Sequence, residues 1–203
     1  MTLSPQLVTG VILAGGMGRR MGGADKGLVE LNGRPMVSQV IARLGPQVAE
    51  LLINANRNAE QYASFGYRVI ADVVGGFAGP LAGLERGLSE ARHDLVVTAP
   101  CDSPFLPHDL VRRLLGAIDN GATDLAVART GSQPHPVFCL CRRSLHPHLS
   151  AFLSAGGRKI DAWYATLKVA EVAFDDQPDA FSNINTRAEL NTHTSSTGGA
   201  LPL

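Results

Sequence analysis

The sequence of 203 residues lacks an excess of either charge, because its 18 lysine and arginine residues equal its 18 aspartate and glutamate residues. A protein that binds nucleic acid through a general basic field is therefore not expected, and any anion must be held by a local group of cations. No apolar stretch reaches the length that crosses a bilayer, and the first ten residues carry no cationic leader. We expect a cytoplasmic protein that contacts no membrane.

Cysteine is also scarce, with three residues in the chain. Cys101, Cys139 and Cys141 have no CxxC spacing typical of a zinc site, and three thiols cannot all form disulfides with one another. This suits a reducing compartment. Cys139 and Cys141 are two residues apart, so we interpret them as positions on the same face of one strand.

The chain does have enough apolar residues for one substantial core, since 45% of it is hydrophobic and its length is typical of a single domain. Apolar runs alternate with amphipathic segments, which predicts a single-domain α/β fold: a Rossmann-like three-layer sandwich with a mostly parallel central sheet. The expected strands are 8–14, 50–54, 68–71, 95–99 and 124–128. The expected helices are 35–44, 59–65, 80–91 and 107–120, and prolines at several of their starts suit a first helical turn.

A glycine-rich segment follows the first expected strand and reads VILAGGMGRRMGGADKGL from Val11 to Leu28. Glycines at the end of a strand let backbone N–H groups approach an anion closely. Arg19, Arg20 and Lys26 add positive charge that suits phosphate oxygens. The segment predicts a phosphate site, although a mobile surface loop with solvated charges is the alternative.

Two familiar glycine loops do not match this segment. A Walker A loop requires serine or threonine after its lysine, whereas Gly27 follows Lys26. A dinucleotide fingerprint requires a third glycine where this sequence has Met21. P-loop and nicotinamide-dependent or flavin-dependent functions are therefore disfavoured.

Polar residues stand at or directly after three further expected strands, as Asn54, Asp72 and Asp102. In a doubly wound sheet these positions meet at the carboxyl edge, so we expect a nucleoside triphosphate to bind there. Asn54 and Asp72 could instead make local turn hydrogen bonds. A carboxylate at the position of Asp102 suits Mg²⁺, with the cap of the following helix as the alternative.

The second half of the chain carries candidate groups for another substrate. Arg158 and Lys159 offer two cations after an expected helix, and Asn183 and Asn185 offer two amides at alternating positions. Such groups suit a pterin-like ligand with a phosphate, although Asn185 and Thr186 could equally cap a helix.

The segment Leu13 to Leu28 resembles the signature of the MobA-type molybdenum cofactor guanylyltransferases, L-A-G-G-x-x-x-R-M-G-G-x-D-K. Every fixed position of that signature is filled. The resemblance continues to about residue 190, through GPLAGL at 79–84, PCDSP at 100–104, HPV at 135–137 and NINT at 183–186.

The resemblance implies a nucleotidyltransferase fold and the transfer of GMP from GTP to the terminal phosphate of molybdopterin, with release of pyrophosphate. It implies catalytic roles for Arg20, Lys26 and Asp102, with Mg²⁺ on Asp102. It implies that GTP contacts Leu13, Ala14, Gly15, Gly16, Lys26, Asn54, Asp72, Gly79 and Asp102. It also implies that molybdopterin, with or without molybdenum, contacts Arg158, Lys159, Asn183 and Asn185.

The chemistry needs no protein nucleophile, because the attacking phosphate is already ionised. Alignment and charge neutralisation would carry the reaction. The alternatives are a molybdopterin cytidylyltransferase, whose signature has alanine at the position of Gly15, and a GTP-binding regulatory module without turnover. A sugar-1-phosphate nucleotidyltransferase fits less well, because its lysine lies further from its arginine.

We expect one nucleotidyltransferase domain over residues 1–190. Its GTP site would lie mainly in 8–105 and its molybdopterin site mainly in 106–190. Residues 191–203 have no periodicity and are expected to be a disordered tail. We expect the enzyme to be a monomer whose protein partners are those that deliver the cofactor and the molybdoenzymes that accept it.

Overall fold

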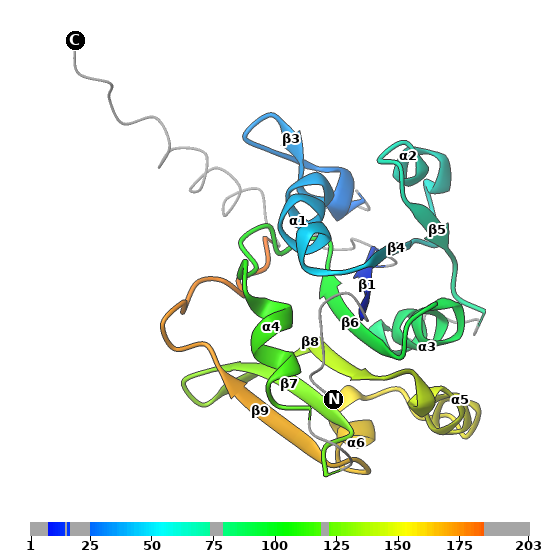
Figure 1. Cartoon of the computed structure of the whole chain (residues 1–203). Helices are drawn as coiled ribbons and strands as arrows, with labels where there is room; N and C mark the ends of the chain where they lie inside the picture. Colours follow the sequence, from blue (N-terminus) through cyan, green and yellow to red (C-terminus); the bar gives the residue numbers. More distant parts are fainter. Residues whose placement is uncertain (1–7, 15, 17–24, 74–78, 119–121, 185–203) are drawn as a thin grey trace.

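The centre of the molecule is a mixed β-sheet, seen in a computed structural model that describes residues 8–14, 16, 25–73, 79–118 and 122–184. Within these residues the sheet has seven strands in the order β5-β4-β1-β6-β8-β7-β9 (Figure 1). In chain order they are β1 (Val8–Leu13), β4 (Glu50–Asn54), β5 (Arg68–Ile70), β6 (Leu95–Pro100), β7 (Leu125–Thr130), β8 (Gln133–Arg142) and β9 (Val169–Ala173).

Most neighbouring strands of the sheet are parallel. β5, β4, β1 and β6 all run in one direction, and β9 is parallel to β7. β8 runs antiparallel to both of its neighbours, β6 and β7. The prediction of a mostly parallel sheet is confirmed, and β8 is the exception.

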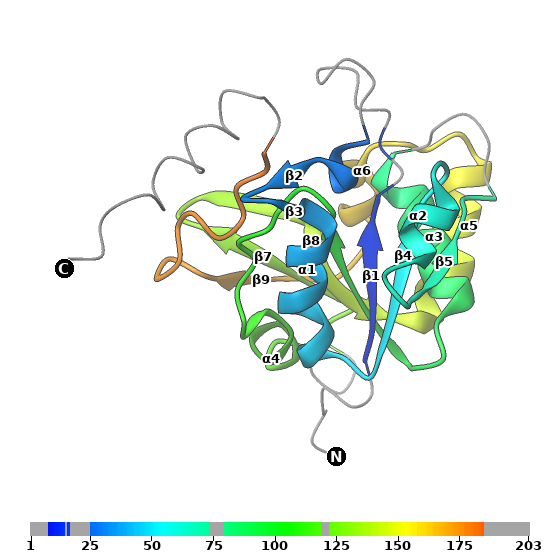
Figure 2. The ribbon, with the colours of Figure 1, turned by 90° about the horizontal axis from the view of Figure 1, so that it is seen from above.

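Helices cover both faces of the sheet. α1 (Met36–Leu44) and α4 (Leu110–Leu115) bury their apolar residues in a core on one face. α3 (Pro80–Glu90), α5 (His146–Ser154) and α6 (Ile160–Tyr164) pack in a second core on the other face. Figure 2 shows α1 and α4 on one side of β1 and α3 and α5 on the other, so the predicted three-layer sandwich is confirmed.

Short elements complete the described fold. α2 (Ala59–Ala63) precedes β5, and a small hairpin joins β2 (Glu30–Leu31) to β3 (Arg34–Pro35). Three short 3-10 helices are η3 (Lys26–Leu28), η4 (Gly45–Gln47) and η5 (Arg143–Leu145).

β1 shows why the central strands are nearly continuous apolar runs. Val8 and Ile12 enter the core under α1, while Val11 enters the core under α3, and all three are fully buried. A strand covered on both faces needs apolar residues on both, which removes the alternation typical of a half-exposed strand.

Two of the predicted helices begin later than expected. Pro35 is extended, with φ −52° and ψ 136°, because it pairs with Glu30 in the hairpin, so α1 begins at Met36. The helix expected over 107–120 is shorter, since α4 begins at Leu110 and its C-cap is Gly116. Only Pro80 is a first helical residue, as predicted. The other predicted strand and helix boundaries are right to within two residues.

The five predicted strand ranges leave out β8 and β9, although a strand through Cys139 and Cys141 was expected. Cys139 and Cys141 both lie in β8 and pack into the same core, so their expected placement on one face of a strand is confirmed. Among the described residues, none of the helices combines the length and the apolar character that a bilayer span requires.

Candidate functional site

The carboxyl ends of three neighbouring strands are joined directly by backbone hydrogen bonds. The N–H of Ala14 donates to the carbonyl of Asn54 at 2.8 Å, and the N–H of Cys101 donates to the carbonyl of Leu13 at 3.1 Å. Leu13 and Ala14 therefore lie between the ends of β4 and β6. The expectation that polar residues from separate strands share one edge is confirmed for this part of the sheet.

A cation and a carboxylate meet at this edge. Lys26 Nζ lies 3.0 Å from Asp102 Oδ2, and the two side chains are 22% and 11% exposed. Asp102 follows β6 directly, whereas α4 begins only at Leu110 with Asp109 as its N-cap. Asp102 therefore does not cap that helix, and its side chain is directed at the lysine of the glycine-rich segment.

The residues on either side of Lys26, Asp25 and Gly27, lie close to the buried hydroxyl group of Tyr62. Tyr62 of α2 is fully buried, and its Oη donates to Asp25 Oδ1 at 2.5 Å. A Cβ atom added to Gly27 would lie 2.5 Å from the same Oη, so only glycine fits there. Burial raises the pKa of Tyr62, with further contributions from Cys101 and Asp25, so the phenol stays a neutral donor.

The segment just before α2 holds the two described ends of the glycine-rich loop. Arg57 donates to the carbonyl of Gly16 at 3.3 Å, and Asn58 Nδ2 donates to Asp25 Oδ2 at 2.9 Å. Asn58 has φ +52°, which a small amide side chain tolerates. The predicted site residues Gly15 and Arg20 lie outside the described residues.

Asn54 and Asp72 are brought together as predicted. Asn54 Nδ2 donates to Asp72 Oδ1 at 2.8 Å, so their side chains bond to each other across the ends of β4 and β5. Asn54 is 2% exposed, and a Cβ atom on Gly83 of α3 would lie 2.4 Å from its Oδ1. Gly83 thus leaves the space that the Asn54 amide occupies. Gly79 is the N-cap residue of the same helix.

One residue predicted for the second substrate lies next to Asp102. The N–H of Ile184 donates to the carbonyl of Asp102 at 2.9 Å, and the Ser103 hydroxyl makes a short hydrogen bond to Asn183 Oδ1. Ser103 is fully buried. The NINT segment therefore meets the PCDSP segment about eighty residues away in sequence, while Asn185 lies outside the described residues.

Arg158 and Lys159 come from a different place, the connection between α5 and α6. Both residues are exposed, and in Figure 2 this connection runs on the side of the sheet where β1 ends. Arg158 also donates through NH1 to the carbonyls of Leu153 and Gly157, at 2.7 and 2.6 Å. One nitrogen of the guanidinium group thus caps carbonyl groups at the C-terminus of α5.

His135 supports the segment that carries Asn183. Its ring stacks on Phe181, with 4.5 Å between centroids, and its Nε2 lies 2.7 Å from Thr130 Oγ1. Burial lowers the pKa of His135, which favours the neutral ring. His135 thus packs directly on Phe181, two residues before Asn183.

Several of these residues were not predicted from the sequence, namely Asn56, Arg57, Asn58, Tyr62 and Ser103. The run NANRN at 54–58 is rich in amides directly after a strand, a signal that could have identified Asn56 and Asn58. Nothing in the sequence separates Tyr62 from an ordinary core residue. Its contact with Asp25 joins residues that are 37 positions apart, so it exists only in the folded chain.

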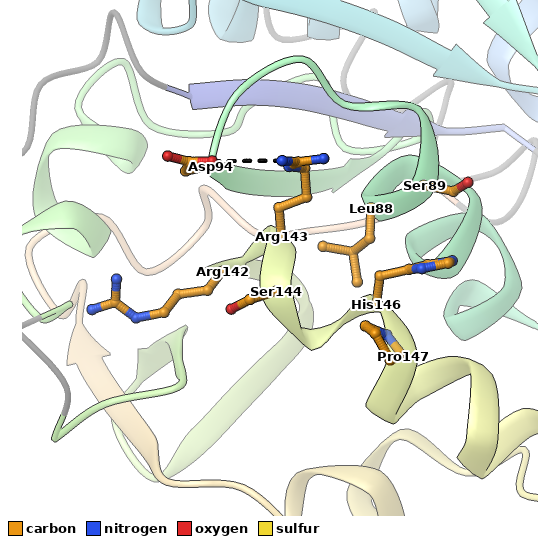
Figure 3. A pocket seen from close by; sticks show the side chains of 8 residues that line it. All are labelled: Leu88, Ser89, Asp94, Arg142, Arg143, Ser144, His146 and Pro147. Atoms are coloured by element: carbon orange, nitrogen blue, oxygen red, sulfur yellow. Dashed lines mark ion pairs between the residues drawn. The ribbon is translucent and has the colours of Figure 1, made fainter.

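A separate hollow of about 640 Å³ is lined by both apolar and polar residues: Leu88, Ser89, Asp94, Arg142, Arg143, Ser144, His146 and Pro147 (Figure 3). Asp94 precedes β6 and Arg142 pairs with Leu95, so the hollow lies at the amino end of that strand. Arg143 is paired with Asp94 at 3.8 Å. The hollow is therefore distinct from the candidate site at the carboxyl ends of the strands.

Comparison with known proteins identifies a family over most of the chain. Residues 10–169 match the model of the MobA-like NTP transferase domain. A molybdenum cofactor guanylyltransferase of Shewanella putrefaciens is 55% identical over 185 residues, covering 91% of this chain and 95% of its own. One from Cupriavidus necator is 54% identical over 191 residues, covering 92% and 96%.

A solved structure has the same fold. The molybdopterin-guanine dinucleotide biosynthesis protein A from Archaeoglobus fulgidus superposes with a TM-score of 0.77 at 24% identity. The match covers 93% of this chain and 97% of that one. At this identity the likeness supports the fold alone.

Proposed function

The chain belongs to the MobA-like NTP transferase family, with molybdenum cofactor guanylyltransferases among its relatives at 54–55% identity, and from this premise we propose its reaction. It transfers GMP from GTP to the terminal phosphate of molybdopterin, forms the guanine dinucleotide form of the cofactor and releases pyrophosphate. It is a nucleotidyltransferase enzyme, as these relatives are named.

The observation that carries this proposal is the junction at Asp102 and Ser103. Lys26, from the phosphate-binding segment, contacts Asp102, and Asn183, from the segment expected to bind molybdopterin, contacts Ser103. Groups for the donor nucleotide and for the acceptor thus meet within two consecutive residues. A group transfer between two phosphates needs this proximity.

The reaction requires alignment rather than a protein nucleophile. An oxygen of the molybdopterin phosphate forms a bond to the α-phosphorus of GTP. The bond from that phosphorus to the oxygen bridging to the β-phosphate breaks, and pyrophosphate leaves with the electron pair. The Lys26 ammonium neutralises negative charge on the phosphates, and we assign Arg20 the same role.

The residues present fit a magnesium ion. Asp102 is a carboxylate that already faces a cation at 3.0 Å, and Mg²⁺ commonly uses one or two carboxylates together with phosphate oxygens and water. Asp102 would hold it. When bound, the ion would withdraw electron density from the phosphate oxygens and neutralise charge on the leaving pyrophosphate.

The other assignments follow the geometry of the strand ends. Leu13, Ala14 and Gly16 would contact GTP through the backbone at the end of β1, together with Gly15. Asn54, Asp72 and Gly79 lie toward β4, β5 and α3 and would hold the nucleoside. For molybdopterin we assign the amides Asn183 and Asn185 and the cations Arg158 and Lys159.

We also propose that the enzyme works as a monomer in the cytoplasm. All three cysteines are buried free thiols, which suits a reducing compartment. The proteins that supply molybdopterin and the molybdoenzymes that receive the product would be its partners. Size-exclusion chromatography with light scattering checks the oligomeric state.

The test of the function is a pyrophosphate-release assay with Mg²⁺, molybdopterin and either GTP or CTP. We expect release that requires molybdopterin and is faster with GTP. Equal or faster release with CTP would make the chain a cytidylyltransferase. Tight GTP binding without any release would make it a regulatory nucleotide-binding module.

A further inference from the structure

Asp72 is held by two amide side chains rather than one. Besides the bond from Asn54, Asn56 Nδ2 donates to Asp72 Oδ2 at 2.7 Å. In return the backbone N–H of Asp72 donates to Asn56 Oδ1 at 2.9 Å. The Asn56 side chain therefore forms hydrogen bonds with both the carboxylate and the backbone N–H of Asp72, and these bonds fix the direction of the carboxylate.

The strand order places this cluster at one end of the nucleotide site. Asp102 follows β6 and Asp72 follows β5, and the strands between them are β1 and β4. Three strand spacings amount to about 14 Å. With the phosphates at Lys26 and Asp102, a nucleotide lying along the strand ends has its base beside Asp72.

The hydrogen-bonding capacity of Asp72 matches guanine. Each carboxylate oxygen accepts one amide hydrogen bond and keeps a further lone pair. Guanine offers two adjacent donors, N1–H and the 2-amino group, which a carboxylate can accept together. Cytosine offers one amino donor next to two acceptors, which a carboxylate repels.

We propose that Asn56 is the positioning residue for base selection, holding the Asp72 carboxylate so that it accepts hydrogen bonds from N1–H and the 2-amino group of guanine. This rests on the proposed GTP site and adds the residue that sets its selectivity. Asn54 cannot do this alone, because it grips one oxygen only, and it is itself buried against Gly83. Asn56 is exposed, so replacing it leaves the core intact.

The test compares kcat/KM for GTP with that for ITP, which lacks the 2-amino group. We expect the unmodified enzyme to favour GTP by about ten- to a hundredfold, the range for a hydrogen bond to a charged group. Asn56→Ala should lower this ratio by about tenfold, mainly through a higher KM for GTP. Gln61→Ala, which removes an exposed amide from neighbouring α2, is the matched control and should leave the ratio unchanged.

A second variant exchanges the two side chains. Asn56→Asp with Asp72→Asn keeps a hydrogen bond between positions 56 and 72, but an amide now faces the base. It offers one donor and one acceptor, which suits xanthine, because a carbonyl replaces the 2-amino group. We expect the exchanged enzyme to prefer XTP to GTP, and circular dichroism to show an intact fold.

Two outcomes would overturn the inference. One is an unchanged GTP to ITP ratio in Asn56→Ala. The other is a loss that is equal for GTP and ITP and disappears with 2′-deoxy-GTP, which would assign Asp72 to the ribose. In either case the unmodified enzyme still releases pyrophosphate from GTP, so the proposed function would stand.

Discussion

At the scale of single residues, Asp102 connects groups that we assign to both substrates. Its carboxylate faces Lys26, its carbonyl accepts from Ile184, and the next residue contacts Asn183. A substitution that removes only the charge of the carboxylate therefore tests its part in the reaction without disturbing the fold.

We predict that Asp102→Asn lowers the rate of pyrophosphate release by about 10²- to 10³-fold, the cost typical of losing one electrostatic group in an active site. The asparagine keeps the size of the side chain and the backbone bond to Ile184, so the circular dichroism spectrum should match that of the unmodified protein. A variant that stays fully active with magnesium as the sole metal would contradict the assigned role.

At the scale of elements, α2 sets the position of Lys26. The helix supplies Tyr62, and the residues just before it supply Arg57 and Asn58, so three contacts hold the described ends of the glycine-rich segment. Loss of the Tyr62 hydroxyl should displace Lys26 without removing any charge.

We predict that Tyr62→Phe lowers kcat by about tenfold or more, since it removes a hydrogen bond to a carboxylate. Gly27→Ala should lower kcat in the unmodified protein, because its Cβ would lie 2.5 Å from Tyr62 Oη. In the Tyr62→Phe background the same change should cost less, and this difference is measured with a double-mutant cycle.

Gly45→Ala is the control for this cycle. Its Cβ would also approach a tyrosine hydroxyl, that of Tyr67, but at 3.6 Å, an ordinary contact. It should leave kcat unchanged. Additive effects of Gly27→Ala and Tyr62→Phe would contradict the arrangement around the hydroxyl.

The elements also show what the sequence can predict. β1 and β6 are nearly continuous apolar runs, and β1 leads into glycines whereas β6 leads into Asp102, so both strands and the place of Asp102 follow from the pattern. Only the part of β8 around Cys139 and Cys141 was expected, because Pro134 and Pro136 interrupt the first half of the strand and its pairing is antiparallel. The contact between Tyr62 and Asp25 depends on the tertiary position of α2 beside β5, which no local pattern encodes.

At the scale of the whole molecule, the two cores share one sheet. Leu44 belongs to the core under α1, and Trp163 to the core under α3, α5 and α6, and both are fully buried. Because β1 contributes to both cores, a substitution that destabilises one core should also lower the stability of the other.

We predict that Leu44→Ala lowers the free energy of unfolding by about 2–5 kcal/mol, the usual range for such a truncation in a core. Trp163 is the single tryptophan, so its fluorescence during urea unfolding reports this loss from the opposite face. The fluorescence midpoint should coincide with the circular dichroism midpoint. Separate midpoints would mean that the two faces unfold independently.

The reversed strand β8 has a consequence for how such enzymes diversify. Every described residue that we assign to GTP precedes it in the chain, and every one that we assign to molybdopterin follows it. An exchange of the coding region from β8 onward would therefore change the acceptor and keep the nucleotide donor. The hydrogen bond between Ser103 and Asn183 joins the two halves, so a new second half must supply a partner for Ser103.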